Sequence, residues 1–122
     1  MNQPFRLIVV ASRDWDDAGR IGSALQVVWN RWLLEEKRQV IKQPPILVLP
    51  GLSTPAGEAA GIIWDKWGGR VEYHPTEGVK EVLDLGADMA IAFIKSASPG
   101  ATAAADLAEN EAGVTVVRIE ES

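Results

Sequence analysis

Cysteine is absent from the chain, which excludes disulfides, thiolate metal ligands and a cysteine nucleophile and fits a reducing compartment. Long apolar runs are absent too, since no stretch approaches the roughly 20 residues that span a bilayer. The N-terminus does not show the basic and then apolar order of a signal peptide. We therefore expect a cytoplasmic protein that does not associate with membranes.

Positive charge is scarce, with 12 Lys and Arg against 17 Asp and Glu and a net charge of −5. Proteins that bind nucleic acids gain most of their affinity from Lys and Arg that neutralise phosphates. The one basic segment, between Arg31 and Lys42, is interleaved with Glu35 and Glu36 and is typical of an exposed helix end. Broad nucleic-acid binding is therefore disfavoured.

Apolar residues make up 47% of the 122 positions, enough for one packed domain over residues 1–122. Continuous apolar runs predict buried strands at residues 5–11, 46–49 and 89–94, and further strands are expected at residues 70–73 and 114–119. Apolar residues at spacings of three and four predict helices at about residues 16–37, 57–67 and 98–112. A short helix that carries Val79, Val82 and Leu83 is expected between a cap at Thr76 and a stop at Gly86. With right-handed crossovers, this alternation predicts an α/β fold: a three-layer, Rossmann-like, doubly wound parallel sheet of five strands in the order 3-2-1-4-5.

The loop Ser12-Arg13-Asp14-Trp15 follows the first predicted strand, where this strand order opens a crevice at the carboxyl ends of the strands. A helix start offers free N–H groups and a positive dipole end to an anion. Arg13 could pair with phosphate, Asp14 could bind ribose hydroxyls, and Trp15 could stack on a base. In the structural alternative, Asp14 caps the helix, Arg13 pairs with a nearby acid, and Trp15 packs against the sheet.

Two further loops carry hydroxyls and glycines at the same predicted edge. The loop after the second strand is neither a Walker A loop nor a G-x-G-x-x-G fingerprint, and an ordinary strand-to-helix turn is its alternative interpretation. The loop before the last helix repeats the pattern and adds one cation. The candidate ligand-binding residues of the three loops are Ser12, Arg13, Asp14, Trp15, Gly51, Ser53, Thr54, Gly57, Glu58, Lys95, Ser98, Gly100 and Thr102.

The chain has one histidine, His74, which follows the third predicted strand. One histidine cannot make the usual metal cluster, and no His-x-x-x-His spacing or Gly-x-Ser-x-Gly elbow occurs. We therefore expect no metal site, no cofactor and no hydrolase triad, and we interpret His74 as structural or solvent-facing.

Five tryptophans are many for this length, and four of them fall on the apolar stripes of the first two long helices: Trp29, Trp32, Trp64 and Trp67. Core packing is the simplest interpretation. Tryptophan is also enriched at subunit interfaces, so we expect a homodimer through these helices.

The Ser12-Arg13-Asp14-Trp15 loop, the glycine-bearing second loop, Gly86-Ala87-Asp88 and Ser98-x-Gly100 together resemble the SLOG superfamily, most closely its small YspA/YpsA-like members. The resemblance implies a Rossmann-like domain, bacterial or from a phage, that binds nucleotides or nucleotide-derived molecules, commonly as a homodimer. Relatives include DprA and cytokinin-activating phosphoribohydrolases. The second loop lacks the arginine of the family pattern, and Ala104 stands where the phosphoribohydrolases carry their catalytic glutamate.

Three functions follow as hypotheses. The first is binding of a nucleotide-like small molecule without catalysis. The second is N-glycosidic cleavage of a nucleoside monophosphate, a phosphoribohydrolase-like reaction with Glu58 or Asp14 as the catalytic carboxylate. The third is a protein-interaction module that has lost its ligand.

Overall fold

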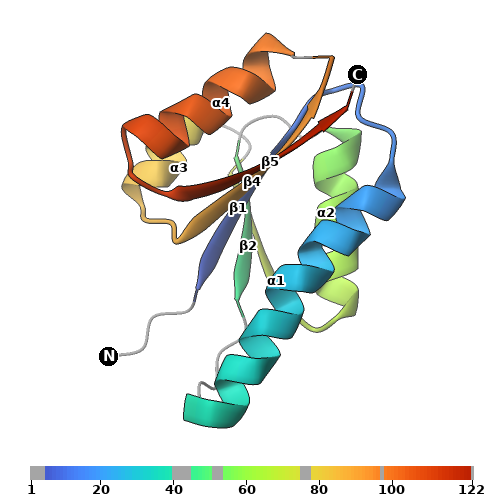
Figure 1. Cartoon of the computed structure of the whole chain (residues 1–122), viewed down its shortest axis with the longest axis vertical. Helices are drawn as coiled ribbons and strands as arrows, with labels where there is room; N and C mark the ends of the chain where they lie inside the picture. The colour runs from blue at the N-terminus through green and yellow to red at the C-terminus, as the bar shows by residue number, and fades with distance from the viewer. Residues whose placement is uncertain (1–4, 40–44, 51–53, 75–77, 97, 122) are drawn as a thin grey trace.

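The computed structural model describes residues 5–39, 45–50, 54–74, 78–96 and 98–121, without the side chains of residues 33–39. Strands and helices alternate along the whole chain (Figure 1). The elements are β1 (Arg6–Ala11), α1 (Ala18–Gln39), β2 (Ile46–Pro50), α2 (Pro55–Lys66), β3 (Arg70–His74), α3 (Val79–Asp84), β4 (Met89–Lys95), α4 (Pro99–Asn110) and β5 (Thr115–Glu121). No helix in the described ranges combines the length and apolar character that crossing a membrane requires.

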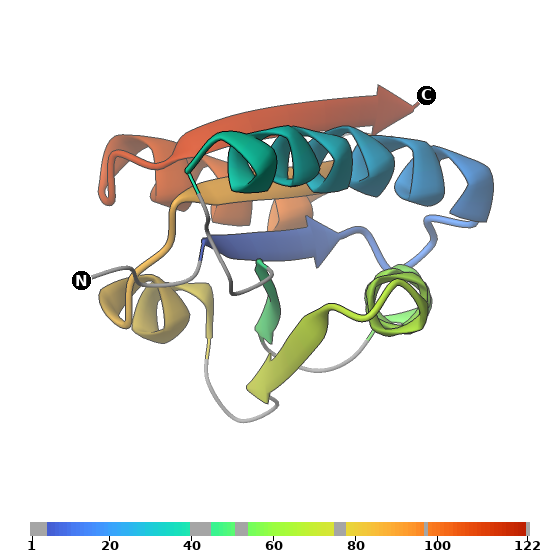
Figure 2. The ribbon, with the colours of Figure 1, turned by 90° about the horizontal axis from the view of Figure 1, so that it is seen from below.

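All strand pairs are parallel, and the sheet order is β3-β2-β1-β4-β5 (Figure 2). The predicted fold class and strand order are therefore confirmed. The central strands β1, β2 and β4 carry the buried apolar runs, because helices cover both faces of the sheet there.

Helix α3 begins at Val79 with Gly78 as its cap, not after Thr76, which lies outside the described residues. Two other helix starts also differ from the predicted ones, and side-chain caps explain both. The main-chain N–H of Arg20 donates to Asp17 Oδ1 at 3.1 Å, so Asp17 caps α1 and the helix begins at Ala18 rather than residue 16. Thr54 Oγ1 accepts from the N–H of Gly57 at 3.0 Å, so α2 begins at Pro55 rather than residue 57.

The core has two sides, separated by the sheet. Helices α1 and α2 bury Ile21, Leu25 and Trp64 against one face, together with Leu7 and Phe93 of the strands. Helices α3 and α4 cover the other face. The buried residues of α4 are all alanines, which let that helix lie close to the strands: Ala101, Ala105 and Ala108.

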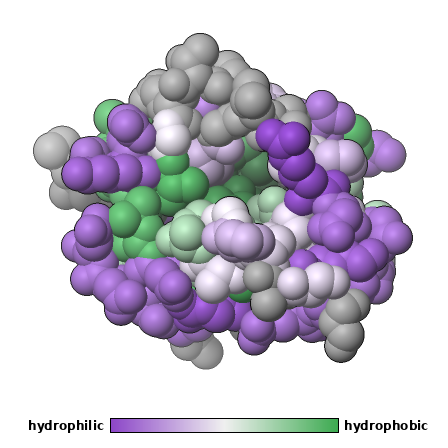
Figure 3. Space-filling view, turned by 90° about the horizontal axis from the view of Figure 1, so that it is seen from above, coloured by the Kyte–Doolittle hydropathy of each residue, from purple (hydrophilic) through white to green (hydrophobic). Residues whose placement is uncertain are grey.

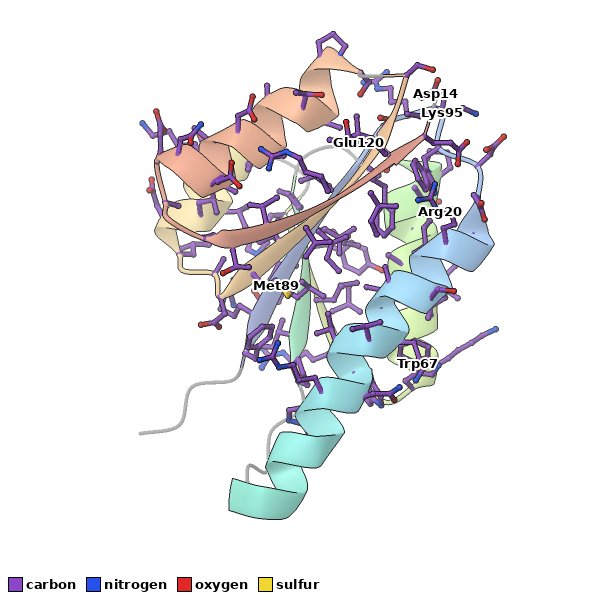
Figure 4. The ribbon with its side chains drawn as sticks, in the orientation of Figure 1. Asp14, Arg20, Trp67, Met89, Lys95 and Glu120 are labelled. Carbon is purple, nitrogen blue, oxygen red and sulfur yellow. The ribbon has the colours of Figure 1, made fainter. Side chains whose placement is uncertain are left out.

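Four tryptophans pack against one another between α1 and α2, and we call them the tryptophan cluster: Trp29, Trp32, Trp64 and Trp67. The ring of Trp29 lies 5.2 Å from Trp32, 4.9 Å from Trp64 and 5.7 Å from Trp67, measured between centroids. Trp64 is fully buried, and its Nε1 donates to the carbonyl of Pro45 at 3.0 Å. Figure 4 shows Trp67 between the two helices. The indoles thus pack within one chain, and the homodimer stays a prediction.

Candidate ligand-binding site

A cavity of about 650 Å³ lies over the carboxyl ends of β1, β2 and β3. The N-terminal ends of α2, α3 and α4 border it, through Thr54, Val79 and Gly100. Figure 3 looks onto this edge and shows a hollow with apolar atoms in its depth and hydrophilic atoms around it. The strand order predicts a crevice between the carboxyl ends of the first and fourth strands. The cavity reaches the start of α4 beside β1, but no residue of β4 lines it, and it extends across β2 to β3 instead.

The residues Ser12 to Trp15 form a tight turn after β1, closed by a hydrogen bond from the N–H of Trp15 to the carbonyl of Ser12 at 3.1 Å. Ser12 is buried. Its Oγ accepts from the N–H of Lys95 at 2.9 Å and lies 2.7 Å from Ser98 Oγ. Ser12 therefore ties the end of β1 to the end of β4 and the start of α4.

Trp15 lies in the core rather than in the cavity. Its side chain is 2% exposed and packs on Phe93 with ring centroids 5.3 Å apart. Its Nε1 donates to the carbonyl of Asp17 at 3.0 Å, and the guanidinium of Arg20 lies 5.4 Å from its ring. The base-stacking role predicted for Trp15 is therefore wrong, because no face of this ring is open to a ligand.

Arg13 and Asp14 occupy the tip of the turn, where both are exposed and line the cavity. The cap of α1 is Asp17, so the alternative interpretation of Asp14 as the helix cap does not hold. Figure 4 shows Asp14 at the carboxyl end of the sheet, near Lys95. The turn thus has two buried side chains, those of Ser12 and Trp15, and two exposed ones at the cavity, those of Arg13 and Asp14.

The other two predicted loops contribute only in part. Thr54, Gly57, Ser98 and Gly100 line the cavity. Three described candidates of these two loops do not line it: Glu58, Lys95 and Thr102. Lys95 Nζ instead pairs with Asp16 at 3.4 Å and Glu121 at 3.9 Å. Gly51 and Ser53 lie outside the described residues.

Replacing Ser12 by alanine should lower the free energy of unfolding by about 1–3 kcal/mol, because the partly buried N–H of Lys95 would lose its acceptor. Urea denaturation followed by circular dichroism measures this loss. The matched control is Ser23→Ala on the exposed side of α1, which should change stability little. Equal losses in the two variants would contradict the anchoring role of Ser12.

The structure shows a group of charged and polar side chains that the sequence did not predict. We call it the Arg6–Glu72–His74 network. Arg6 Nη1 donates to both carboxylate oxygens of Glu72 at 3.1 Å, and Glu72 Oε1 lies 3.3 Å from His74 Nε2. Arg6 Nε donates to the carbonyl of Gly86 at 2.8 Å, and its main-chain N–H donates to Asp88. His74 lines the cavity. Glu72 and His74 are two apart on a strand and so share a face, a signal that the sequence contains.

Opposing effects act on the pKa of Glu72. Burial raises it, whereas hydrogen bonds from His74 and Arg6 and the charges of Arg6 and Arg70 lower it, and the net pKa lies below the usual 4.5. A carboxyl whose pKa is lowered on folding stabilises the fold above its unfolded pKa, and that contribution is lost as the pH falls through the folded value.

Glu72→Gln should therefore lower the free energy of unfolding by about 1–2 kcal/mol at neutral pH, because it removes charge-assisted hydrogen bonds. The difference from the parent should disappear in acid, as the pH falls below 4.5 and through the folded pKa of Glu72. Urea unfolding at a series of pH values measures both curves. If the difference in free energy of unfolding between the variant and the parent stays constant down to the lowest pH, Glu72 does not act as an ionised carboxylate in this network.

Within the described ranges, no three histidine or acidic side chains gather into a group that could hold a metal ion. Comparison of the chain with protein-family models, curated proteins and solved structures found no match. The candidate site is thus defined by its own geometry.

Proposed function

We propose that the cavity binds a small anionic molecule, a nucleotide or a nucleotide-derived compound, without catalysing a reaction. The observation that carries this proposal is that Arg13 and the N-terminal ends of two 12-residue helices, α2 and α4, border one cavity. Helix N-termini present free N–H groups and a positive dipole end, and a guanidinium pairs with phosphate oxygens.

The start of α4 is the better anion-binding end of the two. Its first turn carries no acidic residue, whereas α2 has Glu58 in its first turn. A Cβ built on Gly100 would meet no atom within 4 Å, so there is open space in front of the backbone there. Ser98 at the cap adds a hydroxyl to the cavity wall. We therefore assign the phosphate to Arg13 and this helix start.

The remainder of the cavity suits the less polar part of a ligand. Its lining includes Val9, Val10, Leu49 and Ala104, as well as Tyr73, which is 57% exposed. A volume of about 650 Å³ lies within the range of small-molecule sites. The resemblance to the SLOG superfamily favours a nucleotide among anionic molecules with an apolar body.

The geometry favours binding over N-glycosidic cleavage. Glu58, one of the two carboxylate candidates for that reaction, does not line the cavity. Asp14 does line it, and so remains the residue to test for catalysis.

Arg13→Ala should weaken the binding of nucleoside monophosphates by about 10- to 100-fold, because a charge-assisted hydrogen bond contributes about 1.5–3 kcal/mol. A thermal-shift screen of nucleotides finds the ligand, and calorimetry then compares the two proteins. A ligand at 100 times its dissociation constant should stabilise the parent by roughly 2.7 kcal/mol. The matched control is Arg31→Ala on α1, which removes the same charge from an exposed position that does not line the cavity.

Two outcomes would overturn this proposal. If no nucleotide stabilises the parent protein, an interaction module is the better description. If the parent releases free base from a nucleoside monophosphate and Asp14→Asn does not, the cavity is an enzyme site.

A further inference from the structure

We propose that the outer edge of β5 binds a second copy of this chain, so that the β5 strands of two copies pair antiparallel about a twofold axis at Ile119. The sheets of the two copies then join into one continuous sheet. No residue of β5 lines the cavity, so this inference does not depend on the proposed function. It places the contact between copies on a strand edge and not on the tryptophan cluster, whose rings pack within one chain.

The strand β5 is an edge strand whose outer side pairs with no described strand. It ends the sheet order, and Figure 2 shows it as the outermost strand of the ribbon. Its seven residues pair with β4 in an unbroken register and include no proline, glycine or lysine. Proteins commonly block a free edge with a bulge, a proline, lysines or a covering segment. Because β5 has no bulge, proline or lysine, its outer edge is suited to pairing with another strand.

The main-chain groups that face outward belong to alternate residues of β5. The N–H of Ser96 donates to the carbonyl of Glu121 at 2.7 Å, so the main-chain groups of Glu121 turn toward β4. The groups of successive residues in a strand point to opposite sides, so those of Glu120 and Arg118 turn outward. Among the described side chains, that of Arg20 reaches them, with a long hydrogen bond of 3.4 Å to the carbonyl of Glu120. A carbonyl oxygen has two lone pairs and can accept a second N–H.

Charge complementarity selects a second copy as the partner. Arg118 and Glu120 are two apart and share the face that carries α4, where Arg118 pairs with Asp106 at 2.8 Å and Glu109 at 3.1 Å. Glu120 is exposed, and no ion pair joins it to another residue of the described ranges. In an antiparallel pair about Ile119, Arg118 lies opposite the partner's Glu120, and the same contact recurs on the other side of the axis. The edge is thus complementary to itself, as a twofold contact requires.

Other axes along β5 match less well. An axis at Arg118 would place two guanidinium groups opposite each other, and like charges in that position destabilise a strand pair. An axis at Val117 would place Arg118 opposite the apolar Val116. With the axis at Ile119, this residue lies opposite its own copy on the face that carries α1, where it already packs against the core.

Cross-linking tests the register. The chain contains no cysteine, so a single introduced cysteine can form a disulfide only with its own copy. Opposite residues of a non-hydrogen-bonded antiparallel pair have Cα atoms about 4.5 Å apart, within the range of a disulfide. Ile119→Cys should therefore form a covalent dimer under mild oxidation. The matched control is Val117→Cys on the same face, because its two copies would lie about 13 Å apart along the strands.

Sedimentation equilibrium tests the charge pairing without a cross-link. The parent should be a dimer, and Glu120→Lys should raise its dissociation constant about tenfold or more, because a lysine then faces the partner's Arg118 on both sides of the axis. The control Glu111→Lys makes the same change of charge at the exposed C-cap of α4, and it should leave the dissociation constant unchanged.

Three results would overturn the inference. These are a parent that stays monomeric at every concentration, a cross-link that forms as readily at Val117→Cys as at Ile119→Cys, and a dimer that Glu120→Lys does not weaken. Melting temperatures report whether the variants fold. If Ile119→Cys does not fold, the sedimentation comparison decides, because Glu120 is exposed.

Discussion

Replacing Trp64 by alanine is expected to lower the free energy of unfolding by about 3–5 kcal/mol, the cost of deleting a large buried side chain that leaves a cavity. Trp64 is fully buried, and its ring contacts Trp29 and Trp67 with centroid distances of 4.9 and 6.1 Å. Its loss would remove the centre of the contact between α1 and α2. It would also leave the carbonyl of Pro45 without the indole N–H.

Guanidinium denaturation measures this loss of stability. Two further variants separate the contribution of the hydrogen bond and provide an exposed control. Trp64→Phe keeps most of the apolar volume and removes the N–H, so the hydrogen bond alone should account for about 1 kcal/mol of its cost. Ile62→Ala changes a residue of the same helix that is 56% exposed, and it should cost well under 1 kcal/mol. Losses of similar size at Trp64 and Ile62 would contradict the packing described above.

Gly69→Ala is expected to destabilise the fold by about 1–3 kcal/mol or more, although it adds a single methyl group. A Cβ on Gly69 would lie 2.4 Å from Cδ1 and Nε1 of Trp64 and 3.0 Å from Cζ3 of Trp29. The indole of Trp64 cannot move aside easily, because it is buried and hydrogen-bonded to Pro45. The strain therefore falls on the backbone between α2 and β3.

A double-mutant cycle separates this clash from other effects of the added methyl group. In a Trp64→Ala background, Gly69→Ala should cost much less, because the ring that it meets is gone. The neighbouring Gly68→Ala gives a different cost, since its φ of +88° disfavours any L side chain while the space around it is open. That cost should be the same in both backgrounds. If the double variant loses as much stability as the sum of Gly69→Ala and Trp64→Ala, the added methyl group does not clash with Trp64.

The sheet could be predicted from the sequence because each strand is marked by the apolar pattern of its own residues. A run such as Met89 to Ile94 is apolar and continuous, which indicates burial on both faces wherever the strand lies. Strict alternation of strands and helices, with right-handed crossovers, then leaves few strand orders. The first residue of α1 is harder to predict, because Asp14, Asp16 and Asp17 all precede the helix and each could cap it. The structure shows that Asp17 supplies the cap.

The site was predicted less completely, because its contacts depend on direction and register. A turn has no fixed periodicity, so the sequence does not say that Ser12 and Trp15 point inward while Arg13 faces the cavity. The orientation of Glu58 depends on where α2 begins. The Arg6–Glu72–His74 network joins positions 66 residues apart, and it forms only because β1, β2 and β3 pair in one register.

The turn after β1 separates buried structural positions from exposed positions at the cavity within four residues. Ser12 and Trp15 fasten it to the sheet and the core, while Arg13 and Asp14 at its tip have exposed side chains. Under the proposed function, substitutions at these two adjacent codons change ligand preference without loss of the scaffold. A saturation library at Arg13 and Asp14 is accordingly a small starting point for redesigning specificity, and most of its members should remain folded.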